Sequence, residues 1–225
     1  MSERPNAKDD AANMGPTRNE ARKFVSERGP FEICADTKLN PPIPRESLGS
    51  SEAEAQIADF FEHSALAAKV GEKAAREKVV EMYRAISPGT STTTLFAQKR
   101  RGGMSLMHSW FGPNFPLFRH SHPRLGDCLY FVLAGEILLG SRRLGAGSRF
   151  FVPNGQPYKY IAGPEGAEVL EFRAGGGERG QPGMKLDETS LDAMQRIIDG
   201  ARATEDAWEP PEHVGDSAHG KPPRA

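Results

Sequence analysis

The sequence predicts a mainly β protein, a sandwich or barrel of short strands, with helices before and after it. Between residues 91 and 174, strand-like segments follow one another at short intervals and are separated by Gly and Pro turns. Helical periodicity occurs only on the two sides of that region. The chain has 225 residues, of which 37% are hydrophobic, and its mean hydropathy is −0.56. These values predict that part of the chain is solvated arm or tail.

The N-terminal part is expected to contain an arm followed by a helical extension. Residues 1–22 are polar throughout, which predicts a disordered arm. Residues 23–90 are predicted to form an extended arm and the helices. Within them, the sequence PPIP at residues 41–44 excludes regular helix, and such a segment can lie along another surface, including that of a partner subunit. Helical patterns are then expected over residues 50–61 and 72–86.

The rest of the chain completes the predicted order. Residues 91–174 are predicted to form the β-barrel, with strands at residues 92–96, 104–111, 117–122, 128–133, 136–140, 148–152, 158–161 and 168–173. Residues 175–202 are read as a glycine-rich linker and an amphipathic C-terminal helix. Residues 203–225 are expected to be a polar, proline-rich tail, in which Trp208 is the one large apolar side chain.

Charge and cysteine content argue against several classes of protein. The net charge is −1, so no overall field attracts nucleic acid or a membrane surface. Cys34 and Cys128 lie far apart, which predicts reduced thiols and no disulfide framework. No apolar stretch approaches the roughly 18 residues of a membrane span, and the first residues lack a secretory apolar region. We therefore expect a cytoplasmic protein without nucleic-acid or membrane partners.

The clearest chemistry lies in residues 118–135, which read FRHSHPRLGDCLYFVLAG. His120 and His122 are two positions apart, so that in a strand both imidazoles point to the same side of the sheet. Imidazole is a good ligand for Fe, Ni, Cu and Zn. The pair therefore predicts a metal site, while the alternative that both histidines only line a polar interior stays open.

Residues 118–160 resemble the two sequence motifs of the cupin superfamily. His120-Ser121-His122 matches the His-x-His pair of the first motif, and residues 131–136 resemble its strand and glycine turn. Gly147 and Pro153-Asn154-Gly155 match the second motif. The resemblance implies a cupin-type double-stranded β-helix, or jelly-roll barrel, with an N-terminal helical extension and a C-terminal helix.

Two positions depart from these motifs. The first motif carries a glutamate, and counting forward from His122 gives Asp127, whereas counting back from Gly135 gives Cys128. Because a shift of one residue reverses the face of a strand, Asp127 and Cys128 are alternative candidates for this metal ligand. The last histidine of the second motif is replaced by Tyr158. The ligand set that the resemblance implies is therefore incomplete beyond the histidine pair.

The candidate ligands differ in the metal that they favour. Two imidazoles with the Asp127 carboxylate suit Fe or Mn and leave open positions, whereas a Cys128 thiolate favours Zn. We therefore expect a divalent Fe, Mn, Ni or Zn ion. Tyr158 is a candidate general acid or base, or a phenolate ligand. His108 is a second candidate for proton transfer if its strand face points inward; a histidine satisfied by its own hydrogen bonds is the alternative.

The resemblance implies two classes of function. The first is a metal-dependent enzyme acting on a small molecule, of the dioxygenase, isomerase, decarboxylase or lyase type, and fold analogy does not choose among these reactions. The second is a non-catalytic cupin that binds or senses a small molecule and has lost part of its metal site. We also expect a homodimer, because small cupin barrels commonly pair and the proline-rich arm could exchange between subunits.

Overall fold

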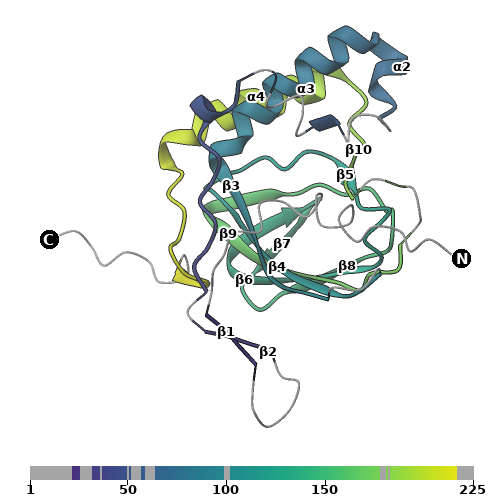
Figure 1. Cartoon of the computed structure of the whole chain (residues 1–225). Helices are drawn as coiled ribbons and strands as arrows, with labels where there is room; N and C mark the ends of the chain where they lie inside the picture. The colour runs from purple at the N-terminus through teal and green to yellow at the C-terminus, as the bar shows by residue number, and fades with distance from the viewer. Residues whose placement is uncertain are drawn as a thin grey trace, which may run out of the picture.

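The computed structural model describes residues 22–25, 32–35, 37–49, 51, 57–58, 64–98, 102–177, 181 and 183–216. The helices are η1 (Arg45–Ser47), α2 (Leu66–Val70), α3 (Glu72–Ile86), η2 (Ser87–Gly89), α4 (Leu191–Thr204) and η3 (Glu205–Ala207). The strands are β1 (Arg22–Val25), β2 (Glu32–Ala35), β3 (Thr90–Ala97), β4 (Ser105–Phe111), β5 (His120–Ser121), β6 (Cys128–Leu139), β7 (Arg142–Gly145), β8 (Arg149–Val152), β9 (Ile161–Arg173) and β10 (Lys185–Leu186). Figure 1 shows the helices gathered at one end of a curved sheet.

The main sheet is antiparallel and has the strand order β3-β4-β9-β6-β7, with β8 also paired to β6. β5 and β10 form a separate two-stranded pair, and His120 is joined to Tyr158 by an isolated bridge. Two register shifts interrupt the β6–β9 pairing near Gly135. At Gly135 φ is +66°, and a Cβ there would lie 2.1 Å from the carbonyl oxygen of Gly166. Only glycine allows this approach of the two strands.

The inner and outer faces of the sheet follow from alternation along its strands. In β6, Cys128, Tyr130 and Val132 are buried, whereas Leu129 and Phe131 are 41% and 40% exposed. The side chains of β6 that are one position apart thus face an interior and a solvated surface. The interior face is the one that carries the candidate site.

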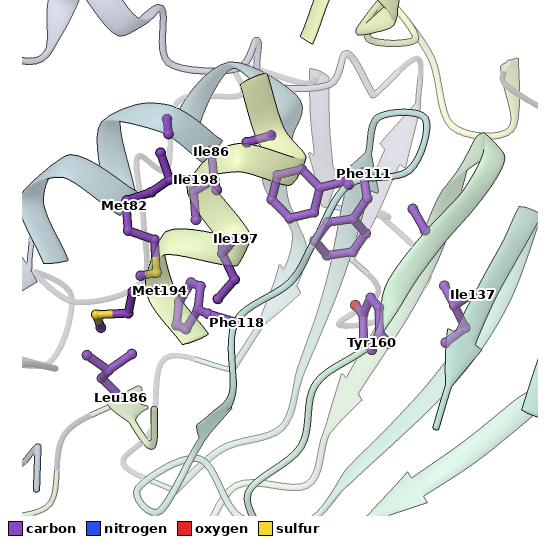
Figure 2. Close-up of a cluster of buried hydrophobic side chains, with 14 of the residues drawn as sticks. Met82, Ile86, Phe111, Phe118, Ile137, Tyr160, Leu186, Met194, Ile197 and Ile198 are labelled. Carbon is purple, nitrogen blue, oxygen red and sulfur yellow. The ribbon is translucent and has the colours of Figure 1, made fainter. Parts of the chain in front are cut away.

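The helices cover one end of this interior with a continuous apolar core. Buried side chains recur every three or four residues in α3, at Val79, Met82 and Ile86, and this spacing places them on one helix face. In Figure 2, Met82 and Ile86 lie beside Met194, Ile197 and Ile198 of α4. The same cluster continues through Phe118 to Phe111 and Tyr160. The side chain of Ser190 caps α4 by accepting a hydrogen bond from Ala193 N at 3.0 Å.

Segments from both ends of the described chain lie across the outer face of β3, β4 and β9. Asn40 N donates to Thr93 Oγ1 at 2.7 Å, and Gly215 N donates to Glu168 Oε2 at 2.7 Å. The two segments are joined to each other, because Leu39 N donates to Glu212 O at 3.2 Å. Residues 37–40 and 212–216 therefore act as two connected straps over this part of the sheet.

The structure confirms the mainly β fold class, with helices before the sheet and a helix after it. Several boundaries differ from the predicted ones. The segments predicted at residues 128–133 and 136–140 form one strand, β6, and the segment predicted at 117–122 is a strand only at His120–Ser121. Trp208, expected in a polar tail, is 9% exposed, and its Nε1 donates to Pro113 O at 3.0 Å.

Some predictions fall on residues outside those described. They include most of the predicted arm at residues 1–22, most of the first helical pattern at residues 50–61, and the end of the tail beyond residue 216. Within the described ranges, no helix combines the length and the apolar character needed to cross a membrane.

Candidate functional site

The two predicted histidines lie side by side in the interior. His120 is 4% exposed and His122 is 8% exposed, and their ring centroids are 4.9 Å apart. His120 Nδ1 is 2.9 Å from Phe118 O, and His122 Nδ1 is 2.8 Å from Gly183 O. A carbonyl oxygen only accepts hydrogen bonds, so each Nδ1 carries the proton. Both Nε2 atoms therefore present a lone pair to the interior.

The two lone pairs converge on one hydroxyl group. Tyr158 Oη lies 3.0 Å from His120 Nε2 and 3.3 Å from His122 Nε2. It also lies 2.6 Å from Tyr130 Oη. The backbone fixes this arrangement, because the amides and carbonyls of His120 and Tyr158 bond each other at 3.1 and 2.9 Å. We call these four residues, His120, His122, Tyr130 and Tyr158, the histidine–tyrosine cluster.

Within the histidine–tyrosine cluster, one hydrogen-bond acceptor is left without a donor. Each tyrosine has one O–H, so Tyr130 can donate to Tyr158, and Tyr158 can then donate to only one of the two imidazoles. The other Nε2 lone pair has no proton left to it within the cluster. A buried acceptor of this kind costs free energy unless another group occupies it. The cluster can therefore accept a further donor or a cation between the imidazoles.

Burial keeps the cluster uncharged near neutral pH. It lowers the pKa of His120 and, together with the charges of Arg173 and His120, lowers the pKa of His122 well below its usual value. Burial also raises the pKa values of Tyr130 and Tyr158 well above the usual one. Neutral imidazoles are the form that binds metal ions, and neutral phenols are able to donate a proton.

A charged pair from β9 faces the same interior. Glu171 Oε2 accepts a hydrogen bond from Arg173 Nη2 at 2.7 Å, and its Oε1 accepts one from Ser109 Oγ at 2.6 Å. The side chains of Glu171 and Arg173 are only 8% and 12% exposed. Burial, the largest single influence, lowers the pKa of Arg173, and the acidic groups around it, Glu171 first among them, together raise that pKa above its usual value. Arg173 therefore stays charged inside the fold.

The structure separates the two alternative ligands, Asp127 and Cys128. Cys128 begins β6 with its thiol buried, and burial raises the pKa of that thiol. Asp127 is exposed, and its Oδ1 accepts a hydrogen bond at 2.8 Å from Asn154 N, in the turn that follows β8. Cys128 thus shares the inward face with Tyr130, while Asp127 holds a surface turn. This placement argues against Asp127 as a ligand beside the histidines.

His108 lies on the opposite face of β4 from the cluster. Its neighbour Ser109 bonds Glu171 in the interior, and adjacent residues of a strand point to opposite faces. His108 Nε2 lies 2.7 Å from Glu168 Oε2, and both side chains are fully buried. Gly215 N bonds the same carboxylate oxygen. The structure thus places His108 under the strap at residues 212–216, away from Tyr158.

The residues present fit a metal ion only in part. Among the described residues, no three His, Cys, Asp or Glu side chains come together in a way that could hold one. The histidine pair nevertheless offers two neutral Nε2 atoms with their tautomers fixed by carbonyl groups, as metal-ligating histidines have. Tyr158 supplies the only oxygen in the cluster within hydrogen-bond distance of both of them. The available donor set is therefore His120, His122 and the phenol of Tyr158.

Four interior residues were not expected in the site from the sequence: Tyr130, Glu171, Arg173 and Ser109. Tyr130 lies in the apolar run of residues 128–133, and the polar side chains of β9 carry no motif. Alternation along β9 places Glu171 and Arg173 on one face, and this was the available signal. Which face of β9 points inward depends on the pairing of β9 with β4 and β6, which the sequence does not reveal.

Among known proteins, only solved structures resemble this chain, and the resemblance is one of fold. No protein-family model matches the chain, and no curated protein matches it. Solved structures that resemble it include a cupin-like protein of unknown function from Ralstonia eutropha JMP134, with 18% identity over 52% of this chain and 76% of that one, and a TM-score of 0.35. KdgF from a Halomonas species has 20% identity over 40% and 83% of the two chains, with a TM-score of 0.34.

A third structure of this kind is the polyketide cyclase RemF from Streptomyces resistomycificus, with 20% identity over 48% of this chain and 77% of that one, and a TM-score of 0.38. Two of the similar structures are described as a cupin or as cupin-like. At these identities the similarity concerns the fold alone, and no activity is inferred from it.

Proposed function

We propose that this chain is a cupin-fold enzyme that acts on a small molecule with the help of a divalent metal ion held by His120 and His122. The observation that carries the proposal is the convergence of both Nε2 atoms on Tyr158 Oη, at 3.0 and 3.3 Å. Neutral imidazoles with fixed tautomers are prepared to bind Fe, Mn, Ni or Zn. A bound ion would supply Lewis-acid or oxygen-activating chemistry at this point.

The protein's own part in the reaction is proton transfer through the tyrosine pair. Tyr158 lies next to both imidazoles and 2.6 Å from Tyr130 Oη, so a proton that leaves Tyr158 can be replaced from Tyr130. Burial raises the pKa of both phenols, which favours Tyr158 as a proton donor over a permanent phenolate. Cys128 faces the same interior and remains a candidate ligand if Zn is the ion.

Elemental analysis of protein produced without a metal-binding tag tests this proposal. We expect near-stoichiometric Fe, Mn, Ni or Zn in the wild type, and its loss in a His120→Gln/His122→Gln variant. His213→Gln is the matched control, because His213 is exposed and lies in the strap at residues 212–216. The proposal would be contradicted by protein that is metal-free and whose melting temperature does not change when divalent ions are added.

The second candidate is a cupin that binds or senses a small molecule without catalysis. It is favoured by two observations: Tyr158 stands where the cupin motif has a histidine, and the described residues hold no group of three metal-type side chains. In this case ligand binding persists in metal-free protein. Tyr158→Phe then changes the ligand affinity, and neither the wild type nor the variant converts the ligand. Measuring ligand affinity before and after chelation separates the two functions.

The expected homodimer has a candidate surface on the outer face of β6, β8 and β9. Leu129, Phe131, Phe151 and Phe172 are 41%, 40%, 57% and 38% exposed. Leu129 is paired directly with both Phe151 and Phe172, so the exposed side chains form one patch, the outer apolar patch. A second copy of the chain placed on the same patch would cover it. Light scattering that gives a mass near the 24.5 kDa of one chain would refute the dimer.

A further inference from the structure

Arg173 brings a positive charge to the interior of the sheet, next to the histidine–tyrosine cluster. It is the last residue of β9 and is paired with Ser105 and Cys128. Two positions earlier, Glu171 is paired with Tyr130, so Arg173 lies one layer nearer the strand end than Tyr130 and on the same face. Its charge acts on both Tyr158 and His122. A molecule held by the cluster would therefore lie close to this guanidinium group.

The guanidinium group has donors that the described residues do not use. Arg173 Nη2 donates to Glu171 Oε2 at 2.7 Å, whereas Nε is buried and has no hydrogen-bond partner. The side chain as a whole is 12% exposed. An arginine presents five N–H donors in a planar fork, and a buried donor without an acceptor destabilises the fold. The unpaired Nε–H is therefore a place for an acceptor that comes with a ligand.

We propose that Arg173 determines specificity by binding a carboxylate group of the small molecule that occupies the site. This inference rests on the proposed function as a small-molecule site. The two oxygens of a carboxylate match the guanidinium fork, which can offer them Nε–H and an Nη–H in parallel. The imidazoles and phenols of the cluster are neutral. Arg173, which lies beside the cluster, carries the positive charge that can recognise an anionic group.

Charge balance favours a singly charged carboxylate over a phosphate. In the metal-free site, the charge of Glu171 offsets that of Arg173, so a ligand with one negative charge leaves one unbalanced charge in the interior. A phosphate that carries up to two charges near neutral pH would leave more, and burying uncompensated charge is costly. Glu171 therefore has two effects, since it orients Arg173 and also competes with the ligand for it. Ser109 holds Glu171 in this position through its hydroxyl group.

The test compares carboxylates with their neutral amides on the full-length protein. The probes are acetate with acetamide, benzoate with benzamide, and inorganic phosphate, and the dissociation constants come from calorimetry and from ligand-dependent shifts of the melting temperature. We expect the wild type to bind a carboxylate and not its amide. In a charge-balanced Arg173→Met/Glu171→Gln variant we expect carboxylate binding to weaken by roughly tenfold to a hundredfold.

Two further variants keep the test decisive if the double variant folds poorly. Glu171→Gln alone removes the competing charge and should tighten carboxylate binding, whereas Arg173→Lys keeps the charge but loses the fork and should weaken it. Arg143→Met is the matched control, because Arg143 pairs with Glu136 at the surface. We expect this control to bind carboxylates as the wild type does.

Several outcomes would overturn the inference. They are equal binding of carboxylates and amides, no carboxylate binding at all, tighter binding of phosphate than of carboxylate, and unchanged affinity in a folded Arg173 variant. Metal content is measured on the same samples. If the wild type is metal-free but carboxylate binding still depends on Arg173, the metal-dependent function fails and this inference stands. If the metal is present and depends on His120 and His122 while carboxylates do not bind, the reverse holds.

Discussion

Replacing Gly112 by alanine should destabilise the fold through a single side chain, Trp208. A Cβ on Gly112 would lie 2.2 Å from Cδ1 and 2.8 Å from Nε1 of the Trp208 ring. The ring is closed in by Gly89 as well, where a Cβ would lie 2.5 Å from it. Because atoms cannot approach so closely, Gly112→Ala must displace the indole, break its hydrogen bond to Pro113 O and expose a ring that is now 9% exposed.

The expected size of this effect lies between two known costs. Overpacking a core costs about 1–3 kcal/mol, and removing a buried Trp side chain altogether costs about 3–5 kcal/mol. We therefore expect Gly112→Ala to lower the free energy of unfolding by about 2–4 kcal/mol, with the Trp208→Ala cost as its upper limit. In a Trp208→Ala background the same glycine substitution should cost almost nothing.

A double-mutant cycle measured by urea unfolding tests this reasoning, with circular dichroism following the backbone and tryptophan fluorescence following the ring. Gly145→Ala is the matched control, because a Cβ at Gly145 meets nothing within 4 Å. If Gly112→Ala costs the same with and without Trp208, the steric argument is wrong. The same conclusion holds if Gly112→Ala is no more destabilising than the control.

Three other predictions concern the site and the outer surface. Burial lowers the pKa of His120 and His122 below the usual 6.5, so the unfolded chain binds more protons below that pH. Stability should be fully present above about pH 6.5 and fall as the pH drops, by up to about 1.4 kcal/mol per histidine per pH unit; urea titrations of a His120→Gln/His122→Gln variant should show a shallower fall. Tyr158→His should tighten metal binding by adding a third imidazole, seen as slower loss of the metal to a chelator, and equal metal affinity in variant and wild type would count against the proposed donor set. Phe151→Asp should shift the protein from dimer to monomer in light scattering without loss of melting temperature, and an unchanged mass would show that the outer apolar patch is not the interface.

The histidine pair could be predicted from the sequence because its spacing alone decides its geometry. In any strand, positions two apart share a face, and the structure places His120 and His122 together as that rule requires. The choice between Asp127 and Cys128 could not be made in the same way. Residues 128–133 read CLYFVL, which is apolar on both faces, so hydrophobic alternation gives no indication of which side points inward. Only the pairing of Cys128 with Val152 and Arg173 settles it.

Trp208 shows a second limit of sequence reasoning. It stands in a stretch rich in proline and charge, which is typical of a solvated tail. Its pocket is made by glycines at positions 89 and 112, which are far away in the sequence and have no local pattern that identifies them. A cavity assembled from such distant backbone positions becomes visible only once the strands and loops are placed.

Strand β9 explains why the polar half of the site was missed. Hydrophobic patterning alone would turn Leu170 and Phe172 inward and leave Glu171 and Arg173 in solvent. The structure has the opposite arrangement, with Phe172 38% exposed and the Arg173 side chain 12% exposed. Such an inversion costs stability, and proteins break local rules of this kind mainly at functional sites.

The inversion also connects the two sites for which we propose partners, the interior site at Arg173 and the outer apolar patch. The register that brings Glu171 beside Tyr130 in the interior is the same register that pairs Phe172 with Leu129 on the outer face. A one-residue shift of β9 would bury the phenylalanine and expel the charged pair together. Carboxylate recognition by Arg173 and pairing through the outer apolar patch therefore depend on one structural choice. A substitution that changes the pairing of β9 with β6 should impair both at once, whereas Arg173→Met/Glu171→Gln should impair only the first.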